Sequence, residues 1–116
     1  MNRNRRKYKR IHAKHLLNYR VIPREKAKIH GEGVGLTQQV SEGGFLFETN
    51  ESFPAGTALE FELAIQDQVI RIVGTVIYIL EKDHGHYDLG IKFADISPKH
   101  RTLIRAMVQK SPDSVD

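Results

Sequence analysis

Two short segments of this chain hold the residues whose types and spacing suit the chemistry of ligand binding. The first is an arginine pair, Arg6 and Arg10, in the basic run RRKYKR at residues 5–10. Guanidinium groups donate two parallel hydrogen bonds to phosphate oxygens or to the O6/N7 edge of guanine. The two side chains would lie about 13 Å apart on an extended segment and about 6 Å apart on a helical turn. Both spacings suit one ligand of dinucleotide size.

The second segment is the polar turn QVSEGG at residues 39–44. Ser41 offers a hydroxyl that both donates and accepts hydrogen bonds. Gly43 and Gly44 lack a Cβ atom, so a ligand can approach the main chain closely there, and such a turn can present N–H groups to an anion. Together the two segments predict a site for a ligand that carries phosphates and base edges.

The other polar residues do not predict catalysis. The histidines form no set with the spacing of metal ligands. Ser41 has no nearby His–Asp pair and no nucleophile-elbow pattern, and Glu60 and Glu62 alternate with apolar residues on the outer face of an expected strand. A glycine-rich phosphate loop ending in Lys-Ser/Thr is also missing from the sequence. We therefore expect neither enzyme activity nor a metal or cofactor.

Charge is distributed unevenly along the 116 residues. Residues 1–30 hold 11 Lys and Arg against one acid, Glu25, whereas residues 31–116 hold 7 bases and 13 acids. A basic arm on a mildly acidic body implies an anionic partner, or docking of the arm on its own body. The chain contains no cysteine, which fits a reducing compartment. It shows neither a signal-peptide pattern nor an apolar run of the roughly 20 residues that cross a bilayer. We expect one cytoplasmic domain without membrane insertion.

Alternating hydrophobic residues predict β-structure through most of the chain. The expected strands are residues 16–22, 31–40, 45–47, 59–65, 69–80 and 87–93. Five or six strands with short turns favour a small antiparallel barrel, because closure removes exposed sheet edges. The segment 69–80 is apolar on both faces, so we expect both of its faces to be covered.

The periodicity changes once, near the end of the chain. Ser97 and Pro98 are typical of a helix N-cap and first helical position, and Ser111-Pro112 ends the pattern. One face of this helix would cap the barrel with Leu103, Ile104, Met107 and Val108. The predicted organisation is a flexible basic arm at 1–13, a barrel at 14–96 and a C-terminal helix at 97–110.

The two polar segments together resemble the paired motifs of the PilZ domain family, Arg-x-x-x-Arg and Asp/Asn-x-Ser-x-x-Gly. The doubled Arg5-Arg6 and the run SEGGF at 41–45 are typical of that family, and YDLGIKF at 87–93 is similar to its late Leu-Gly-Val/Ile-x-Phe strand. The resemblance extends from about Arg5 to the C-terminal helix. It implies a six-stranded antiparallel β-barrel with a flanking helix that acts as a bacterial receptor for cyclic di-GMP.

The resemblance also implies a role for each matched residue. Arg6 and Arg10 would clamp phosphates and guanine edges, and Arg5 would add a secondary contact. Ser41 would hydrogen-bond the ligand, above a turn that Gly44 shapes. The implied ligand-binding set is Arg5, Arg6, Arg10, Gln39, Ser41, Gly43 and Gly44. Ligand binding would order the arm on the barrel and change the surface offered to an effector protein that the sequence does not identify.

Gln39 departs from the family pattern, which has Asp or Asn at that position. The Gln39 amide oxygen still accepts a hydrogen bond, but its stem is one methylene longer and carries no charge. A lost charge-assisted hydrogen bond to guanine costs about 1.5–3 kcal/mol, or about one to two decades of affinity.

Two alternatives remain open. One is a PilZ-like protein-interaction module that binds the nucleotide weakly or not at all, with Gln39 as the trace of that loss. The other is a nucleic-acid-binding barrel whose basic arm neutralises phosphates. The acidic body and the placement of most phenylalanines in core positions count against nucleic acid as a partner.

Overall fold

The computed structural model describes residues 8–23 and 31–115. Arg5 and Arg6 lie outside these residues, as does the loop expected at 24–30. The described elements follow one another as β1 (Arg10–His12), β2 (Leu16–Val21), β3 (Glu32–Ser41), β4 (Gly44–Thr49), β5 (Ala58–Ile65), β6 (Gln68–Glu81), the 3-10 turn η1 (Asp83–Gly85), β7 (Tyr87–Asp95) and α1 (Pro98–Lys110).

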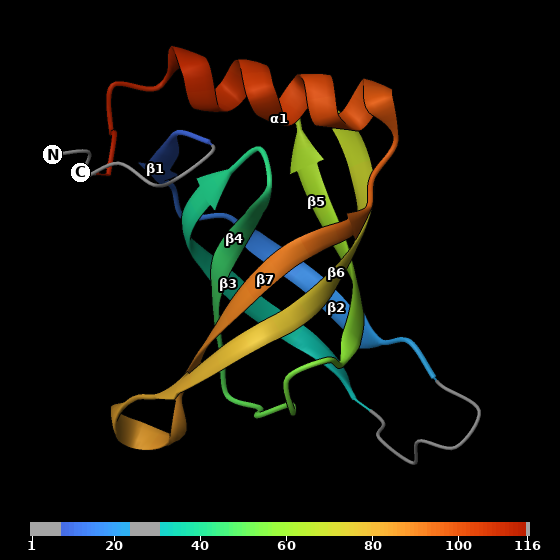
Figure 1. Ribbon diagram of the computed structural model, residues 1–116, viewed down its shortest axis with the longest axis vertical. Helices are drawn as coiled ribbons and strands as arrows, with labels where there is room; N and C mark the ends of the chain where they lie inside the picture. Colours follow the sequence, from blue (N-terminus) through green and yellow to red (C-terminus); the bar gives the residue numbers. More distant parts are fainter. Residues whose placement is uncertain (1–7, 24–30, 116) are drawn as a thin grey trace, which may run out of the picture.

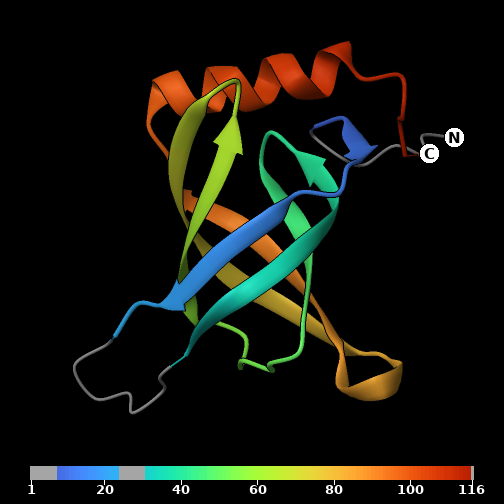
Figure 2. The same ribbon diagram turned by 180° about the vertical axis from the view of Figure 1, so that it is seen from behind.

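Within the described residues, six antiparallel strands close into a barrel (Figures 1 and 2). The strand order is β3-β2-β5-β6-β7-β4, and pairing of β3 with β4 closes the cylinder. The two-residue connection between β5 and β6 has positive φ at Gln66 and Asp67, which suits the twist of a tight hairpin. The predicted six-stranded antiparallel barrel is therefore confirmed.

The barrel interior is filled by the inward half of each alternating strand. All five phenylalanines are buried. Phe61 meets Phe45 and Phe47 edge to face, with ring centroids 4.8 and 5.1 Å apart. Such aromatic pairs contribute about 0.5–1.5 kcal/mol beyond the burial of their area. The aromatic cluster gives the outer-face residues a rigid support.

Helix α1 lies across one end of the barrel (Figure 1). Ser97 caps its N-terminus, because the Ser97 Oγ accepts a hydrogen bond from the His100 N–H at 3.2 Å. Ile104 and Val108 are buried against the core, and Leu103 and Met107 pack partly against it. The predicted helix and its capping face are confirmed, and the buried face closes the barrel end that the strands leave open.

The N-terminal arm becomes ordered earlier than the sequence indicated. The flexible arm was expected to run to residue 13, whereas Arg10–His12 form strand β1 along the end of β3. Ile11 is only 2% exposed, since its side chain joins the core. On its other edge, β1 meets the C-terminal tail: the His12 N–H donates to the Asp113 carbonyl at 2.8 Å, and the Val115 N–H to the Arg10 carbonyl at 2.8 Å. Pairing on both edges accounts for the order of β1.

Strand β6 is not covered on both faces as its composition suggested. The side chains that point away from the barrel at its second half, Ile77, Tyr78 and Leu80, are 52%, 43% and 55% exposed. The described part of the chain contains a single helix, which closes the barrel end instead of the wall, so no layer packs on this face. The apolar residues of β6 therefore form part of the outer surface.

Candidate functional site

Arg10 and Ser41 face each other across two paired strands. In the register of β1 and β3, Arg10 pairs with Ser41, Ile11 with Val40, and His12 with Gln39. The arginine of the first sequence segment and the serine of the second are thus cross-strand neighbours, about 5 Å apart at Cβ. This pairing joins the two segments that the sequence singled out.

A cavity of about 420 Å³ opens beside this pair on the outer surface of the barrel. We call it the Arg10 cavity; Tyr8, Arg10, Gln39, Val40, Ser41, Gly43, Gly44, Phe45, Leu46, Ile77, Tyr78, Gly90, Ile91 and Lys92 line it. It crosses the neighbouring strands β1, β3, β4, β7 and β6, with Arg10 at one edge and Tyr78 at the other. Ligand pockets commonly measure about 300–1,000 Å³, so its size suits a small molecule.

The charges around the Arg10 cavity favour an anion. Among the described residues, its lining holds the cations Arg10 and Lys92 and no carboxylate. A second cavity of similar volume lies over β2, β3 and β5, and its lining includes Glu32, Glu60 and Glu62 with a single cation, Arg20. A ligand with phosphates would be repelled there and attracted to the Arg10 cavity.

Arg10 has bonding capacity to spare. Its Nε atom is buried and has no hydrogen-bond partner among the described residues. A buried donor without a partner costs about 1–3 kcal/mol relative to a paired one. An acceptor placed in the cavity would remove that cost.

The Ser41 hydroxyl makes several hydrogen bonds within the turn between β3 and β4. Its Oγ accepts hydrogen bonds from the N–H groups of Gly43 at 3.1 Å and Gly44 at 3.2 Å, and donates one to the Gly44 carbonyl at 3.2 Å. The sequence suggested that these N–H groups would be presented to an anion. In this structure the serine side chain satisfies them locally, as serine often does in turns. A ligand acceptor would therefore have to replace the Gly44 carbonyl as the partner of the Ser41 hydroxyl proton.

Close approach to the main chain requires glycine at position 44, whereas the neighbour of Gly43 is a side-chain ring; neither glycine has a positive φ. A Cβ atom on Gly44 would lie 2.0 Å from the Ile91 carbonyl oxygen of β7. A Cβ atom on Gly43 would lie 2.8 Å from the ring of Tyr8. Gly44 therefore lets the turn rest on β7, and Gly43 lets the Tyr8 ring pack against the turn.

Gln39 also reaches the cavity. It lies opposite Leu46 of β4 just after a bulge in β3, where Gln38 is the extra residue. Bulges redirect the side chains that follow them. The structure thus brings Arg10, Gln39, Ser41, Gly43 and Gly44 to one cavity. Their role in ligand binding stays a prediction, as does that of Arg5 and Arg6.

The sequence did not predict the part of the cavity that lies opposite Arg10, where Tyr78 forms the edge. The Tyr78 ring covers Gly90 on the neighbouring strand, because a Cβ atom on Gly90 would lie 2.2 Å from it. Tyr8 and Tyr78 offer aromatic surface at opposite edges, and stacking on an aromatic side chain contributes about 1–3 kcal/mol per base. The turn at 83–85 indicated that β6 and β7 pair, but the bulge between Val76 and Tyr78 sets the register.

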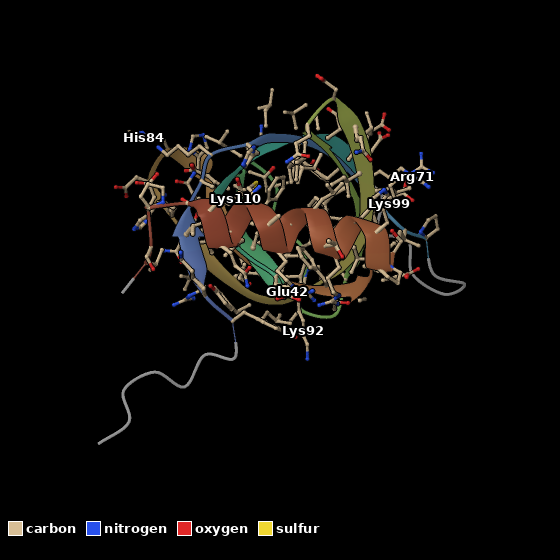
Figure 3. The ribbon with its side chains drawn as sticks, turned by 90° about the horizontal axis from the view of Figure 1, so that it is seen from above. Glu42, Arg71, His84, Lys92, Lys99 and Lys110 are labelled. Atoms are coloured by element: carbon tan, nitrogen blue, oxygen red, sulfur yellow. The ribbon has the colours of Figure 1, made fainter. Side chains whose placement is uncertain are left out.

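Helix α1 contacts the same turn through Glu42. Arg105 donates to Glu42 Oε1 from Nε at 2.9 Å and from Nη2 at 2.6 Å. These hydrogen bonds raise the pKa of Arg105 above its already high ordinary value. Figure 3, which looks down onto α1, shows Glu42 and Lys92 along one side of the barrel, with Arg71 on another. The turn is therefore held by the helix as well as by the sheet.

The described residues contain no group of three or more His, Asp or Glu side chains placed to hold a metal ion. Over the same ranges of the chain, no helix has the length and hydrophobicity needed to span a membrane.

The closed barrel, its capping helix and the cation-lined cavity define the class of small β-barrel binding modules. Residues 4–110 match the PilZ domain family, and the chain belongs to that family. The family consists of binding and adaptor modules, with a fold related to cyclic di-GMP signalling. The resemblance inferred from the motifs is confirmed. A search of curated proteins found no match.

Three solved structures share the fold. The Bacillus subtilis inhibitor of motility (MotI/DgrA) is 19% identical with a TM-score of 0.69; the match covers 92% of this chain and 51% of that one, so the chain spans about half its length. The PilZ domain of YcgR from Escherichia coli, solved with c-di-GMP, is 18% identical with a TM-score of 0.68, covering 91% and 90%. The PilZ domain of CeSA from a cellulose-synthesizing bacterium is 13% identical with a TM-score of 0.58, covering 86% and 94%.

Proposed function

We propose that this chain is a receptor for cyclic di-GMP, which it binds in the Arg10 cavity, and that it signals through a partner protein. The observation that carries the proposal is the register pairing of Arg10 with Ser41 beside a cavity whose described lining residues include cations and no carboxylate. Membership of the PilZ family and the likeness to the YcgR domain solved with c-di-GMP support the choice of ligand.

The described residues suggest how the ligand is held. The unpartnered Arg10 Nε donates to a phosphate oxygen or a guanine edge, and the Ser41 hydroxyl turns from the Gly44 carbonyl to donate to the same molecule. Lys92 adds positive charge, and the rings of Tyr8 and Tyr78 present faces to the two bases. β1 is already paired with β3, so a ligand that bridges Arg10 and Ser41 reinforces this pairing, and the effector protein reads the surface that the bound ligand changes.

Calorimetric titration with cyclic di-GMP tests the proposal. Arg10→Ala should lower the affinity by about one to two decades, as expected for a lost charged hydrogen bond. Arg20→Ala is the matched control: it removes the same charge from the opposite cavity, where Arg20 Nε lies 2.8 Å from Glu60 Oε1. Wild-type protein that gives no heat at high micromolar ligand, or equal affinity for the two variants, would refute the proposal.

Two further titrations sharpen the assignment. Cyclic di-AMP should bind far more weakly than cyclic di-GMP if the arginine reads a guanine edge. Gln39→Asp should tighten cyclic di-GMP binding by about one decade or more, because it restores a charged acceptor for the guanine N–H groups. An unchanged affinity in Gln39→Asp would show that this side chain does not meet the base.

Two observations support the alternative of a PilZ-like protein-interaction module that binds the nucleotide weakly or not at all. The Gly43 and Gly44 N–H groups are already satisfied by Ser41 Oγ, and Gln39 carries no charge, as expected of a PilZ domain that has lost its ligand. Such a protein-interaction module would give no heat with cyclic di-GMP, and Arg10→Ala would leave partner binding unchanged. The nucleic-acid alternative has no comparable support, because carboxylates line the other cavity of the barrel.

A further inference from the structure

The turn that carries Ser41 is attached to helix α1 through Glu42. Glu42 directly follows Ser41, and a single oxygen of its carboxylate receives both Nε and Nη2 of Arg105. Arg101, one turn earlier in α1, donates from Nη1 to the Glu42 main-chain carbonyl at 3.4 Å. The helix therefore holds both the side chain and the backbone of this residue.

The burial of this pair is asymmetric. The Glu42 side chain is 16% exposed, whereas that of Arg105 is 46% exposed. Loss of Arg105 removes the two side-chain hydrogen bonds by which α1 holds this largely covered carboxylate, so the turn is held less firmly against the helix. Ion pairs with one exposed member contribute little to global stability. The consequence of losing Arg105 should therefore appear in the position of the turn more than in the stability of the barrel.

The rest of the turn transmits such a movement to the cavity. The Phe93 N–H donates to the Gly43 carbonyl at 2.9 Å, and Gly44 rests against Ile91, so the sheet holds the turn from β7. Ser41 Oγ is bound to the N–H groups of Gly43 and Gly44. Glu42 thus lies between Ser41 and the two glycines that are hydrogen-bonded to the Ser41 hydroxyl. A displacement of Glu42 should therefore displace that hydroxyl as well.

We propose that Arg105 is a positioning residue of the cyclic di-GMP site, which fixes the Ser41 hydroxyl through Glu42. This inference rests on the proposed function. By linkage it also makes the coupling reciprocal: a ligand that fixes the Ser41 turn strengthens the attachment of α1, so the helix senses occupancy of the cavity.

Arg105→Ala and the exchanged double variant Glu42→Arg/Arg105→Glu test the link, with Arg20→Ala as the matched control. The control breaks another arginine–glutamate pair, in which Arg20 Nε donates to Glu60 Oε1 at 2.8 Å between strands β2 and β5. We expect Arg105→Ala to weaken cyclic di-GMP binding about two- to five-fold, the range set by a partly exposed pair. The double variant should restore most of the loss, since it rebuilds the pair with its polarity reversed.

A second readout needs no ligand. Amide exchange of Gly43 and Gly44, measured by NMR, should be faster in Arg105→Ala than in wild type and unchanged in Arg20→Ala. If wild type binds the ligand but Arg105→Ala matches Arg20→Ala in affinity and exchange, the inference fails and the proposed function stands. If wild type does not bind, the proposed function fails, and the exchange of the two glycines alone decides whether Arg105 positions the turn.

Discussion

Two glycine substitutions with the same shortest contact should have opposite consequences, although a Cβ atom on Gly35 would also lie 2.6 Å from the Glu48 main-chain oxygen. A Cβ atom on Gly90 would lie 2.2 Å from Cε2 of Tyr78, and one on Gly35 would lie 2.2 Å from Cζ of Phe47. Neither distance can persist, so a neighbour must move in each variant. Tyr78 is 43% exposed and can turn its ring toward solvent, whereas Phe47 is fully buried.

The expected change in Tm of each variant depends on whether the neighbouring aromatic ring can move. In Gly35→Ala the Phe47 ring is enclosed by Tyr19 and Phe61, with centroids 5.6 and 5.1 Å away. Overpacking of this kind costs about 1–3 kcal/mol, which corresponds to a fall in Tm of about 4–12 °C for a domain of this size. In Gly90→Ala the ring swings outward. The lower chain entropy of unfolded Ala contributes about 0.4–1 kcal/mol in the opposite direction, so Tm should change little.

The assay combines thermal unfolding by circular dichroism with titration by cyclic di-GMP. Gly90→Ala should keep its Tm and lose affinity by about tenfold, because the displaced ring no longer offers its face to a base. Gly35→Ala should lose Tm, and at a temperature where it is folded it should bind like wild type. Equal losses of Tm in both variants would refute the reasoning about exposure, and unchanged affinity in Gly90→Ala would remove Tyr78 from the site.

Three other predictions concern the tail, the core and the helix. Val115→Pro removes the N–H that bonds the Arg10 carbonyl, so the His12 amide should exchange faster with solvent. Burial, with the Glu51 hydrogen bond, raises the pKa of Tyr19 to about 12 from an ordinary 10. Its neutral form is favoured by folding, so stability should be intact below pH 10 and fall between pH 10 and about 12. Ser97→Ala removes the helix cap and should cost about 1 kcal/mol, or about 4 °C in Tm.

Each of these has a control. Exchange of the His12 amide at the wild-type rate in Val115→Pro would mean that the tail does not hold β1. Tyr19→Phe should lack the alkaline loss of stability, and an identical loss in that variant would assign it to other groups. Ser97→Asp keeps an N-cap acceptor and should retain the wild-type Tm, whereas an equal fall in both variants would point to a different role for the position.

Most of the fold could be predicted from the sequence, because the alternation of apolar and polar residues identifies the inward face of each strand locally. Leu59, Phe61 and Leu63 alternate with polar residues and are all buried, and Ser97 caps the helix as expected. The prediction for β1 was wrong, because a segment of three residues, Arg10–His12, is too short and too basic to show an alternating hydrophobic pattern. The prediction for β6 was also wrong, since apolar composition on both faces does not reveal whether another layer is present to cover the outer one.

The candidate site was predicted in its residues and only partly in its geometry. Arg10 and Ser41 stood out by type, and the resemblance to a family supplied their partnership. Tyr8 and Tyr78 gave no signal, because an isolated tyrosine in a strand or a basic run is not distinctive. The satisfied N–H groups of Gly43 and Gly44 were also unforeseen, since the orientation of the Ser41 hydroxyl depends on the local turn conformation.

By itself the sequence determined which residues point inward, where the helix begins and which side chains can meet an anion, because periodicity and residue chemistry are local properties. Only the tertiary structure decided that Arg10 lies opposite Ser41, that the Tyr78 ring covers Gly90 and that Arg105 holds Glu42. These contacts join residues far apart in the chain. They depend on which strands become neighbours when the barrel closes and on the register that long-range hydrogen bonds then impose.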